Sequence, residues 1–302
     1  MRAFITGMSG FVGGYLAEHL RACGDQAMGS AQKADAPDLV AWDIAMPTTP
    51  DVVEPIAAFA PDVIFHLAAI SKSEDCGGDQ LTPQAIAVNV VGTEHVLELA
   101  FSLPSKPRVV FVSSSYVYPH LNSLEPVSES AALAPPNRYG DSKRQAEERV
   151  LAYSQLHDVD VVIARAFQHT GPRQIARFMV PEWCQQFVQG DEPVVIRNDE
   201  AWIDLLDVRD VVRAYRLLAL QGMRGEVYNV GSGAAQRSGD IFAMLRAMAD
   251  PKRAVHVMSS QPKRGPIADI TKLTSATGWR PQIPLEQTVR DTYAWALAAQ
   301  AS

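Results

Sequence analysis

The first twenty residues read as a short apolar strand, a turn with three evenly spaced glycines, and the start of a helix. Residues 2–6 form a buried-strand pattern, and apolar positions recur with helical spacing over about 11–21. Gly7, Gly10 and Gly13 lie at the junction. Small residues there let the backbone and the helix N-terminus approach a phosphate. We therefore favour a dinucleotide-binding turn over a turn that only packs a helix on a sheet.

Apolar runs alternate with helical patterns through the first half of the chain. Expected strands occupy residues 25–30, 62–69, 108–113 and 159–165, and expected helices occupy 84–102 and 142–157. Near-continuous apolar runs are typical of parallel strands that helices cover on both faces. The sequence therefore predicts an α/β fold, a doubly wound parallel sheet of the Rossmann type.

Beyond Arg165 the alternation weakens and proline-containing loops appear. We expect residues 1–165 to form the dinucleotide-binding Rossmann domain, and 166–199 with 226–302 to form a smaller substrate-binding lobe. The stretch 200–225 is expected to return to the larger domain, with about 203–220 rejoining the main sheet. A chain of 302 residues is long enough for this division.

Tyr139 and Lys143 are four positions apart in a helical pattern, so they project from the same helix face. An ammonium beside a phenol favours the phenolate and lowers a phenol pKa that is ordinarily about 10. Such a phenol suits a proton donor when hydride is added to a carbonyl near neutral pH. Together with a hydride carrier at the glycine turn, the pair predicts carbonyl reduction.

These motifs together resemble the extended short-chain dehydrogenase/reductase family, which includes NAD-dependent epimerases and dehydratases. The resemblance implies an NAD(P)-dependent oxidoreductase. Within the family, the segments 165–174 and 277–281 most resemble the GDP-4-keto-6-deoxy-D-mannose reductases. The matching segments run nearly the whole length of the chain: 6–13, 43–44, 66–69, 89–93, 113–118, 139–143, 207–210 and 228–233.

The resemblance implies a catalytic set of Ser114, Tyr139 and Lys143. Tyr139 is then the general acid, and Lys143 binds the nicotinamide ribose and depresses the tyrosine pKa. Ser114 follows a strand and would bond the substrate oxygen, with Ser115 as the alternative.

Tyr116 separates this chain from one branch of the family. In related sugar 4,6-dehydratases this position resembles a glutamate that removes and returns a proton during water elimination. The hydroxyls of Ser115 and Tyr116 are poor replacements for an acidic pair, so dehydration is disfavoured. Reduction, or epimerisation through a transient ketone, needs no such carboxylate.

Cofactor choice depends on the end of the second strand. An acid there usually binds the ribose hydroxyls of NAD, but the first carboxylate after this strand is Asp35. Ser30 and Lys33 suit a 2′-phosphate, which favours NADP(H) over NAD(H); the alternative is that Lys33 is an ordinary loop charge. Asp43 resembles the residue that caps the adenine amino group. The expected cofactor contacts are Gly7, Ser9, Gly10, Phe11, Val12, Gly13, Ser30, Lys33, Asp43, Ile44, Leu67, Ala68, Ala69, Asn89, Tyr139 and Lys143.

The substrate side departs from the family pattern. Ile203 stands where the family often has a diphosphate-binding arginine, and Gln168 where it often has asparagine. Arg264 resembles another pyrophosphate-contacting arginine, and Arg173 and Arg177 are candidates to compensate for the missing one. The expected substrate contacts are Ser114, Ser115, Tyr116, Gln168, Arg173, Arg177 and Arg264.

The leading hypothesis is a reductase of the ketone in a nucleotide-linked 4-keto-6-deoxy sugar. A nucleotide-sugar 4-epimerase and a dehydrogenase of a free sugar or small alcohol are the alternatives. A catalytically silent sensor or scaffold is disfavoured, because a silent relative has no need to keep Ser114, Tyr139 and Lys143 together.

The bulk properties limit partners and location. A formal net charge of -7 argues against nucleic acid, and three scattered cysteines predict a reduced compartment with neither disulfide framework nor metal site. No evident signal peptide and no long apolar run indicate a cytoplasmic protein without a membrane partner. The helices at 84–102 and 142–157 resemble a dimer interface in relatives, which implies a homodimer.

Overall fold

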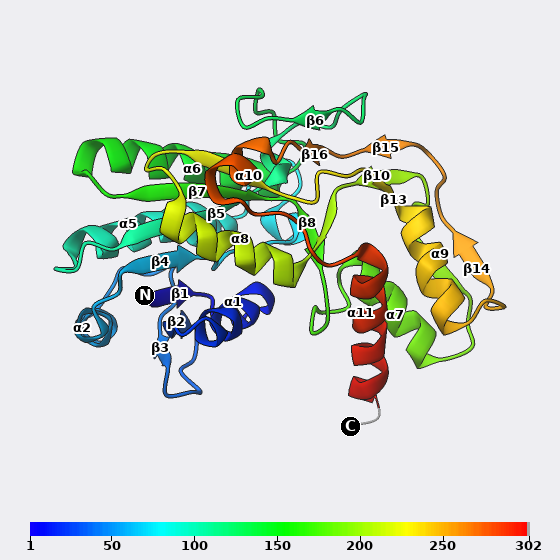
Figure 1. Cartoon of the computed structure of the whole chain (residues 1–302), viewed down its shortest axis with the longest axis horizontal. Coiled ribbons are helices and arrows are strands. Elements are labelled where there is room, and N and C mark those ends of the chain that lie inside the picture. Colours follow the sequence, from blue (N-terminus) through cyan, green and yellow to red (C-terminus); the bar gives the residue numbers. More distant parts are fainter. Residues whose placement is uncertain (301–302) are drawn as a thin grey trace.

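The chain folds around a parallel seven-stranded sheet, seen in a computed structural model that describes residues 1–300 (Figure 1). The strand order is β12-β7-β5-β4-β1-β2-β3, and every pairing is parallel. This confirms the predicted Rossmann-type α/β fold. The strands are β1 (Arg2–Thr6), β2 (Gln26–Ala31), β3 (Leu39–Ala41), β4 (Val63–His66), β5 (Arg108–Ser114), β7 (Val161–Ala166) and β12 (Val227–Val230).

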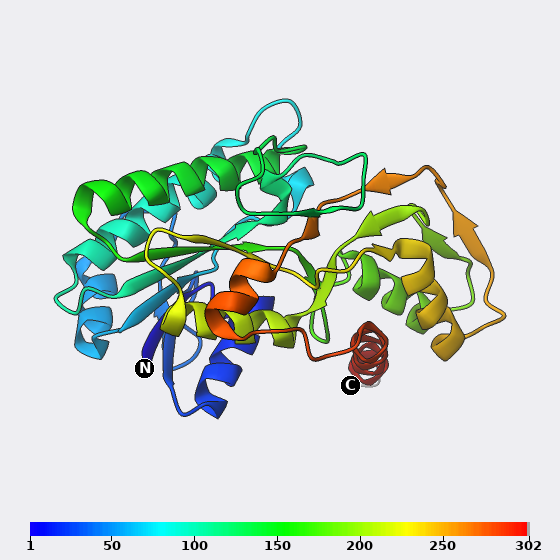
Figure 2. The same cartoon turned by 45° about the horizontal axis from the view of Figure 1, so that its top comes forward.

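Helices cover both faces of the sheet, which is why its strands are apolar on both sides (Figure 2). One apolar core lies under α1 (Phe11–Ala22), α8 (Val208–Gln221) and α10 (Thr271–Thr277). The core of the other face lies under α2 (Pro50–Phe59), α5 (Gly92–Ser102) and α6 (Arg138–His157). Short elements along this part of the chain are α3 (Ser73–Cys76), α4 (Pro83–Ala85), η1 (Ile86–Val91) and η2 (Ser115–Val117).

A smaller lobe stands beside the carboxyl ends of the strands and has its own apolar core (Figure 1). That core is formed mainly by α7 (Met179–Gln189), α9 (Ser238–Ala249) and α11 (Leu285–Gln300). Its short strands are β9 (Val194–Ile196), β10 (Ala201–Ile203), β13 (Gln236–Arg237), β14 (Val255–Val257) and β15 (Lys263–Arg264).

The chain returns to the main sheet in two segments, the helix α8 and the strand β12. The segment 203–220 adds no strand there: β11 (Leu205–Asp207) pairs with β8 (Gln168–Thr170), and α8 packs on the sheet as a helix. The returning strand is β12, whose residues were expected in the smaller lobe. Its buried run Tyr228-Asn229-Val230 pairs with β7 at the edge of the sheet. A separate two-stranded sheet pairs β16 (Ile267–Ala268) with β6 (Pro126–Val127). Across residues 1–300, no helix combines the length and apolar character needed to cross a bilayer.

Candidate active site

A cleft of about 1270 Å³ runs from the glycine turn across the ends of the main strands into the smaller lobe. Ligands of open parallel sheets bind at this edge. Its volume exceeds the roughly 300–1,000 Å³ of a pocket for one small ligand, so the cleft has room for a dinucleotide and a substrate together.

The glycine turn is shaped for close approach. Gly7 has φ +71°, a left-handed conformation that glycine adopts without strain, and a Cβ on Gly13 would lie 2.7 Å from Met8 Cα. Gly10 caps α1, and no side chain of residues 1–300 accepts a hydrogen bond from the first N–H groups of that helix. The cleft therefore receives a helix N-terminus suited to an anionic phosphate.

The end of β2 also fits a dinucleotide. The Ser30 hydroxyl is buried without a hydrogen-bond partner among the described residues, and Ser30 lines the cleft. An unpaired buried hydroxyl is costly, so a ligand oxygen there would satisfy it. Lys33, Asp35 and Asp43 line the same end of the cleft. With the open helix N-terminus, these residues fit the ribose and phosphates of NAD(P).

All but one of the expected cofactor contacts line the cleft. The exception is Asn89, which is buried in the π-helical turn η1 and binds protein groups instead. Its Oδ1 accepts from the Ile70 N–H at 2.8 Å, while its Nδ2 donates to the Ile70 carbonyl at 3.0 Å and to Ser142 Oγ at 2.9 Å. Asn89 thus ties the loop after β4 to α6.

His66 extends this buried network to the glycine turn. Its Nδ1 lies 2.8 Å from Thr6 Oγ1, and its Nε2 lies 3.0 Å from Thr93 Oγ1. Thr93 donates its own hydroxyl to the Asn89 carbonyl, so it accepts from His66 Nε2. Burial, followed by the charge of Lys143, lowers the His66 pKa to about 3. His66 is therefore a neutral structural histidine.

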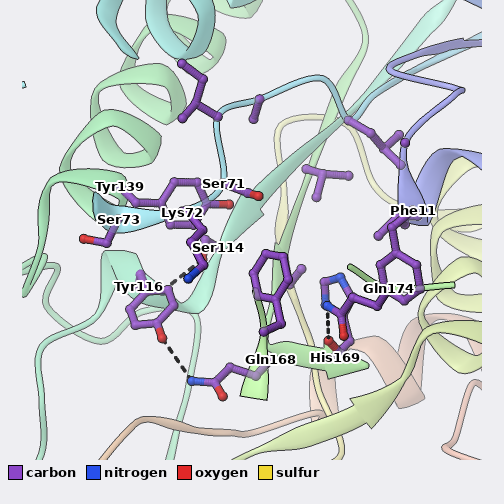
Figure 3. Close-up of a pocket in the computed structure, with 18 of the residues that line it drawn as sticks. Phe11, Ser71, Lys72, Ser73, Ser114, Tyr116, Tyr139, Gln168, His169 and Gln174 are labelled. Carbon is purple, nitrogen blue, oxygen red and sulfur yellow. Dashed lines mark hydrogen bonds between the residues drawn. The ribbon is translucent and has the colours of Figure 1, made fainter. Parts of the chain in front are cut away.

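Ser114 stands at the end of β5 with its hydroxyl oriented by the next turn. The Tyr116 N–H donates to Ser114 Oγ at 3.2 Å. This occupies one acceptor site of the oxygen and leaves the hydroxyl proton for another acceptor. Ser114, Ser115 and Tyr116 all line the cleft, and Figure 3 shows Ser114 and Tyr116 beside Tyr139.

Tyr139 and Lys143 line the cleft from the first turns of α6. The predicted acidification of Tyr139 by Lys143 is absent: burial raises the phenol pKa, and the opposing interaction is with the Ser114 hydroxyl. Burial also lowers the Lys143 pKa to about 8, against an upward effect of Glu147. Burial thus shifts both pKa values toward the neutral form, because a buried site penalises charge, but at pH 7 Lys143 is still mainly protonated. The phenol proton that reduction requires is retained.

The surroundings of the two residues fix their orientation. Lys143 Nζ lies 4.8 Å from the centroid of the Phe111 ring, a cation–π distance. The Tyr139 ring meets the Tyr116 ring edge to face, with centroids 6.2 Å apart. Asn137 caps α6 by accepting from the Gly140 N–H at 2.9 Å. The helix therefore begins at a defined point, which sets the positions of both side chains.

The three arginines expected to bind substrate are placed differently from one another. Arg177 lines the cleft, where both its terminal nitrogens bind Asp75, at 3.1 and 2.9 Å. Arg173 lies outside the lining, paired with Glu18 and stacked over the Tyr15 ring at 3.8 Å. Arg264 belongs to β15 and is also outside the lining. Arg173 and Arg264 are thus not brought to the cleft, because a carboxylate holds the first and strand pairing turns the second away.

The cleft also contains residues that the sequence did not single out. Arg197 and Lys263 line the substrate end, and the buried Tyr215 contributes a phenol without a partner among the described residues. The sequence signal for Lys263 was its place next to Arg264, because neighbouring residues of a strand point to opposite faces. His169 stacks on Phe11 with ring centroids 6.3 Å apart.

Comparisons with known proteins match the chain over most of its length. A sequence profile described as the NAD dependent epimerase/dehydratase family matches residues 3–231. GDP-6-deoxy-D-mannose reductase of Pseudomonas aeruginosa is 28% identical over 309 residues, 96% of this chain and 95% of the relative. A dTDP-glucose 4,6-dehydratase of Actinoplanes sp. is 29% identical over 240 residues, which cover 78% of this chain and 73% of the relative. The structure of RMD from Pseudomonas aeruginosa complexed with NADPH has a TM-score of 0.87 at 26% identity, covering 99% of both chains.

Proposed function

This chain belongs to the NAD dependent epimerase/dehydratase family, and we propose that it reduces the 4-keto group of a nucleotide-linked 4-keto-6-deoxy sugar. The observation that carries the proposal is the common cleft: Ser114, Tyr139 and Lys143 line it together with the glycine turn. The likeness to GDP-6-deoxy-D-mannose reductase over nearly the full length of both proteins favours a GDP-linked substrate.

The proposed chemistry assigns one task to each side chain. NAD(P)H supplies the hydride when it is bound. Ser114 donates its hydroxyl proton toward the substrate carbonyl oxygen, since the other side of Oγ is held by the Tyr116 N–H. Tyr139 gives its proton to the oxygen as negative charge develops there. Lys143 lies on the same helix face and stabilises the resulting phenolate when protonated.

NADP(H) is the proposed preference. The support is the unpartnered Ser30 hydroxyl and the Lys33 side chain at the ribose end of the cleft, together with an NADPH-bound structural neighbour. An ammonium and a hydroxyl complement a 2′-phosphate better than a 2′-hydroxyl.

We also propose a homodimer formed by α5 and α6. The support is the exposure of two apolar side chains, Phe101 on α5 and Leu156 on α6, on neighbouring helices. Light scattering at micromolar concentration should give twice the 32.9 kDa chain mass. A monomer mass would reject the interface.

The function is tested by incubating the purified protein with NADPH or NADH and a panel of GDP-, dTDP- and UDP-linked 4-keto-6-deoxy sugars. We expect one product that is heavier by two hydrogens, with stoichiometric loss of NADPH. Interconversion of 4-epimers with no net cofactor consumption would replace the proposal with the epimerase alternative. Oxidation of free sugars alone would replace it with the free-sugar dehydrogenase.

A further inference from the structure

Tyr116 and Gln168 form a polar pair beside the catalytic tyrosine that the proposed chemistry does not use. The pair joins η2, directly after Ser114, to β8. Gln168 Nε2 donates to the Tyr116 hydroxyl at 3.1 Å, and both residues line the cleft. Figure 3 shows the Tyr116 hydroxyl directed toward Gln168.

The pair has hydrogen-bonding capacity left over. The Tyr116 oxygen accepts from Gln168, and no residue in the range 1–300 accepts the proton of the Tyr116 hydroxyl. The side-chain oxygen of Gln168, Oε1, likewise accepts no hydrogen bond from these residues. Burial raises the Tyr116 pKa, so the phenol keeps its proton. One free donor and one free acceptor therefore stand side by side at the cleft wall.

A single hydroxyl group is the complement of this arrangement. A hydroxyl accepts one hydrogen bond and donates another, whereas a phosphate or carboxylate oxygen only accepts. The location of that hydroxyl follows from the neighbours of Tyr116. Its ring packs on Tyr139 and its N–H holds Ser114, so substrate atoms near it are close to the reacting carbonyl.

We propose that Tyr116 and Gln168 determine specificity by binding a hydroxyl on the carbon next to the substrate carbonyl, so that the enzyme selects α-hydroxy ketones. The proposal rests on the proposed reductase function and narrows its substrate class. Tyr116 donates its phenol proton to the substrate hydroxyl, and that hydroxyl donates to the side-chain oxygen Oε1 of Gln168. Loss of the substrate hydroxyl leaves both protein groups unpaired, which is how buried polar sites discriminate.

The test crosses two enzyme variants with two substrates. The substrates are the 4-keto-6-deoxy sugar that the wild-type protein reduces and its analogue lacking the hydroxyl at C3. The variants are Tyr116→Phe and Gln168→Leu, and Tyr153→Phe on the outer part of α6 is the control. For the hydroxylated substrate we expect either variant to lower kcat/KM by about 10-fold or more, mostly through KM. For the 3-deoxy analogue we expect less than about 3-fold change.

Each outcome has a distinct meaning. An equal loss with both substrates would show that the pair only supports the fold of the site and would overturn the proposal. Unchanged kinetics with the hydroxylated substrate would overturn it as well. If the wild-type protein reduces 4-keto sugars and the variants behave in either of these ways, the proposed function stands without this inference. If the wild-type protein reduces none of the 4-keto sugars, the proposed function and this inference are both rejected.

Discussion

Gly140 lies against the backbone of Tyr116: a Cβ at position 140 would come within 2.7 Å of the Tyr116 carbonyl carbon. This contact joins the first turn of α6 to the turn after β5. Tyr139, the proposed general acid, precedes Gly140, and Ser114 is held by the Tyr116 N–H. The distance between the proposed proton donor and its serine partner is therefore set by a glycine.

Gly140→Ala should displace the start of α6. The added methyl meets backbone, which cannot move aside as a flexible side chain would, so we expect a loss of about 1–3 kcal/mol in unfolding free energy. We also expect kcat to fall, because Tyr139 shifts from Ser114. Gly14→Ala is the matched control: its Cβ has no contact closer than 3.9 Å, and it should be neutral or stabilising. Urea unfolding and steady-state kinetics measure both effects.

Tyr139→Phe should lower turnover by roughly 10²–10⁴-fold, the usual contribution of a positioned acid. The ring and its edge-to-face contact with Tyr116 are retained, so cofactor affinity and thermal stability should stay close to wild type. Fluorescence titration with NADPH and a thermal melt provide these controls. Turnover within a factor of three of wild type would reject Tyr139 as the general acid.

Lys143→Met should stabilise the protein while abolishing activity. Burial lowers the Lys143 pKa from 10.5 to about 8, so below pH 8 the folded state carries a buried charge that the unfolded state solvates better. Between pH 8 and 10.5 the unfolded chain binds more protons at this site, and the penalty in the wild type fades as pH rises. We expect a gain on the order of 1–3 kcal/mol at pH 7 that shrinks toward pH 10.5. Denaturant unfolding at several pH values tests it, and a gain independent of pH would contradict it.

Lys33→Ala should raise the KM for NADPH by about 10-fold or more, since a charge-assisted contact to a 2′-phosphate is lost. The KM for NADH should change by less than about twofold, because that cofactor has no 2′-phosphate. Lys106→Ala, a change outside the cleft lining, is the control. An equal change in the KM values for both cofactors would show that Lys33 does not bind the 2′-phosphate.

The wild-type protein should not eliminate water from dTDP-glucose, although a dehydratase is among its relatives. Ser115 and Tyr116 line the cleft where elimination requires an acid that exchanges protons, and burial raises the Tyr116 pKa. Mass spectrometry after incubation with NAD⁺ should find no product lighter by one water. Such a product would reopen the dehydratase assignment.

The strands and the site were predictable to different degrees. The apolar runs around residues 62–69 and 108–113 predicted buried parallel strands, because local pattern alone determines that preference. The pKa of Tyr139 was not predictable, since helix spacing places Lys143 beside it but says nothing about desolvation. Asn89 was assigned to the cofactor for a similar reason: its partners, Ile70 and Ser142, are distant in sequence.

The path of the chain between the two lobes limits how such a protein can be rebuilt. After β7 the chain enters the smaller lobe, comes back through α8 and β12, leaves again for α9, returns with α10, and ends in α11 (Figure 1). No single cut separates the lobes, so neither half is expected to survive as an autonomous fragment. A recombinant chimera with an exchanged smaller lobe would require three separate insertions with matched junctions, and point substitution along the cleft is the shorter route.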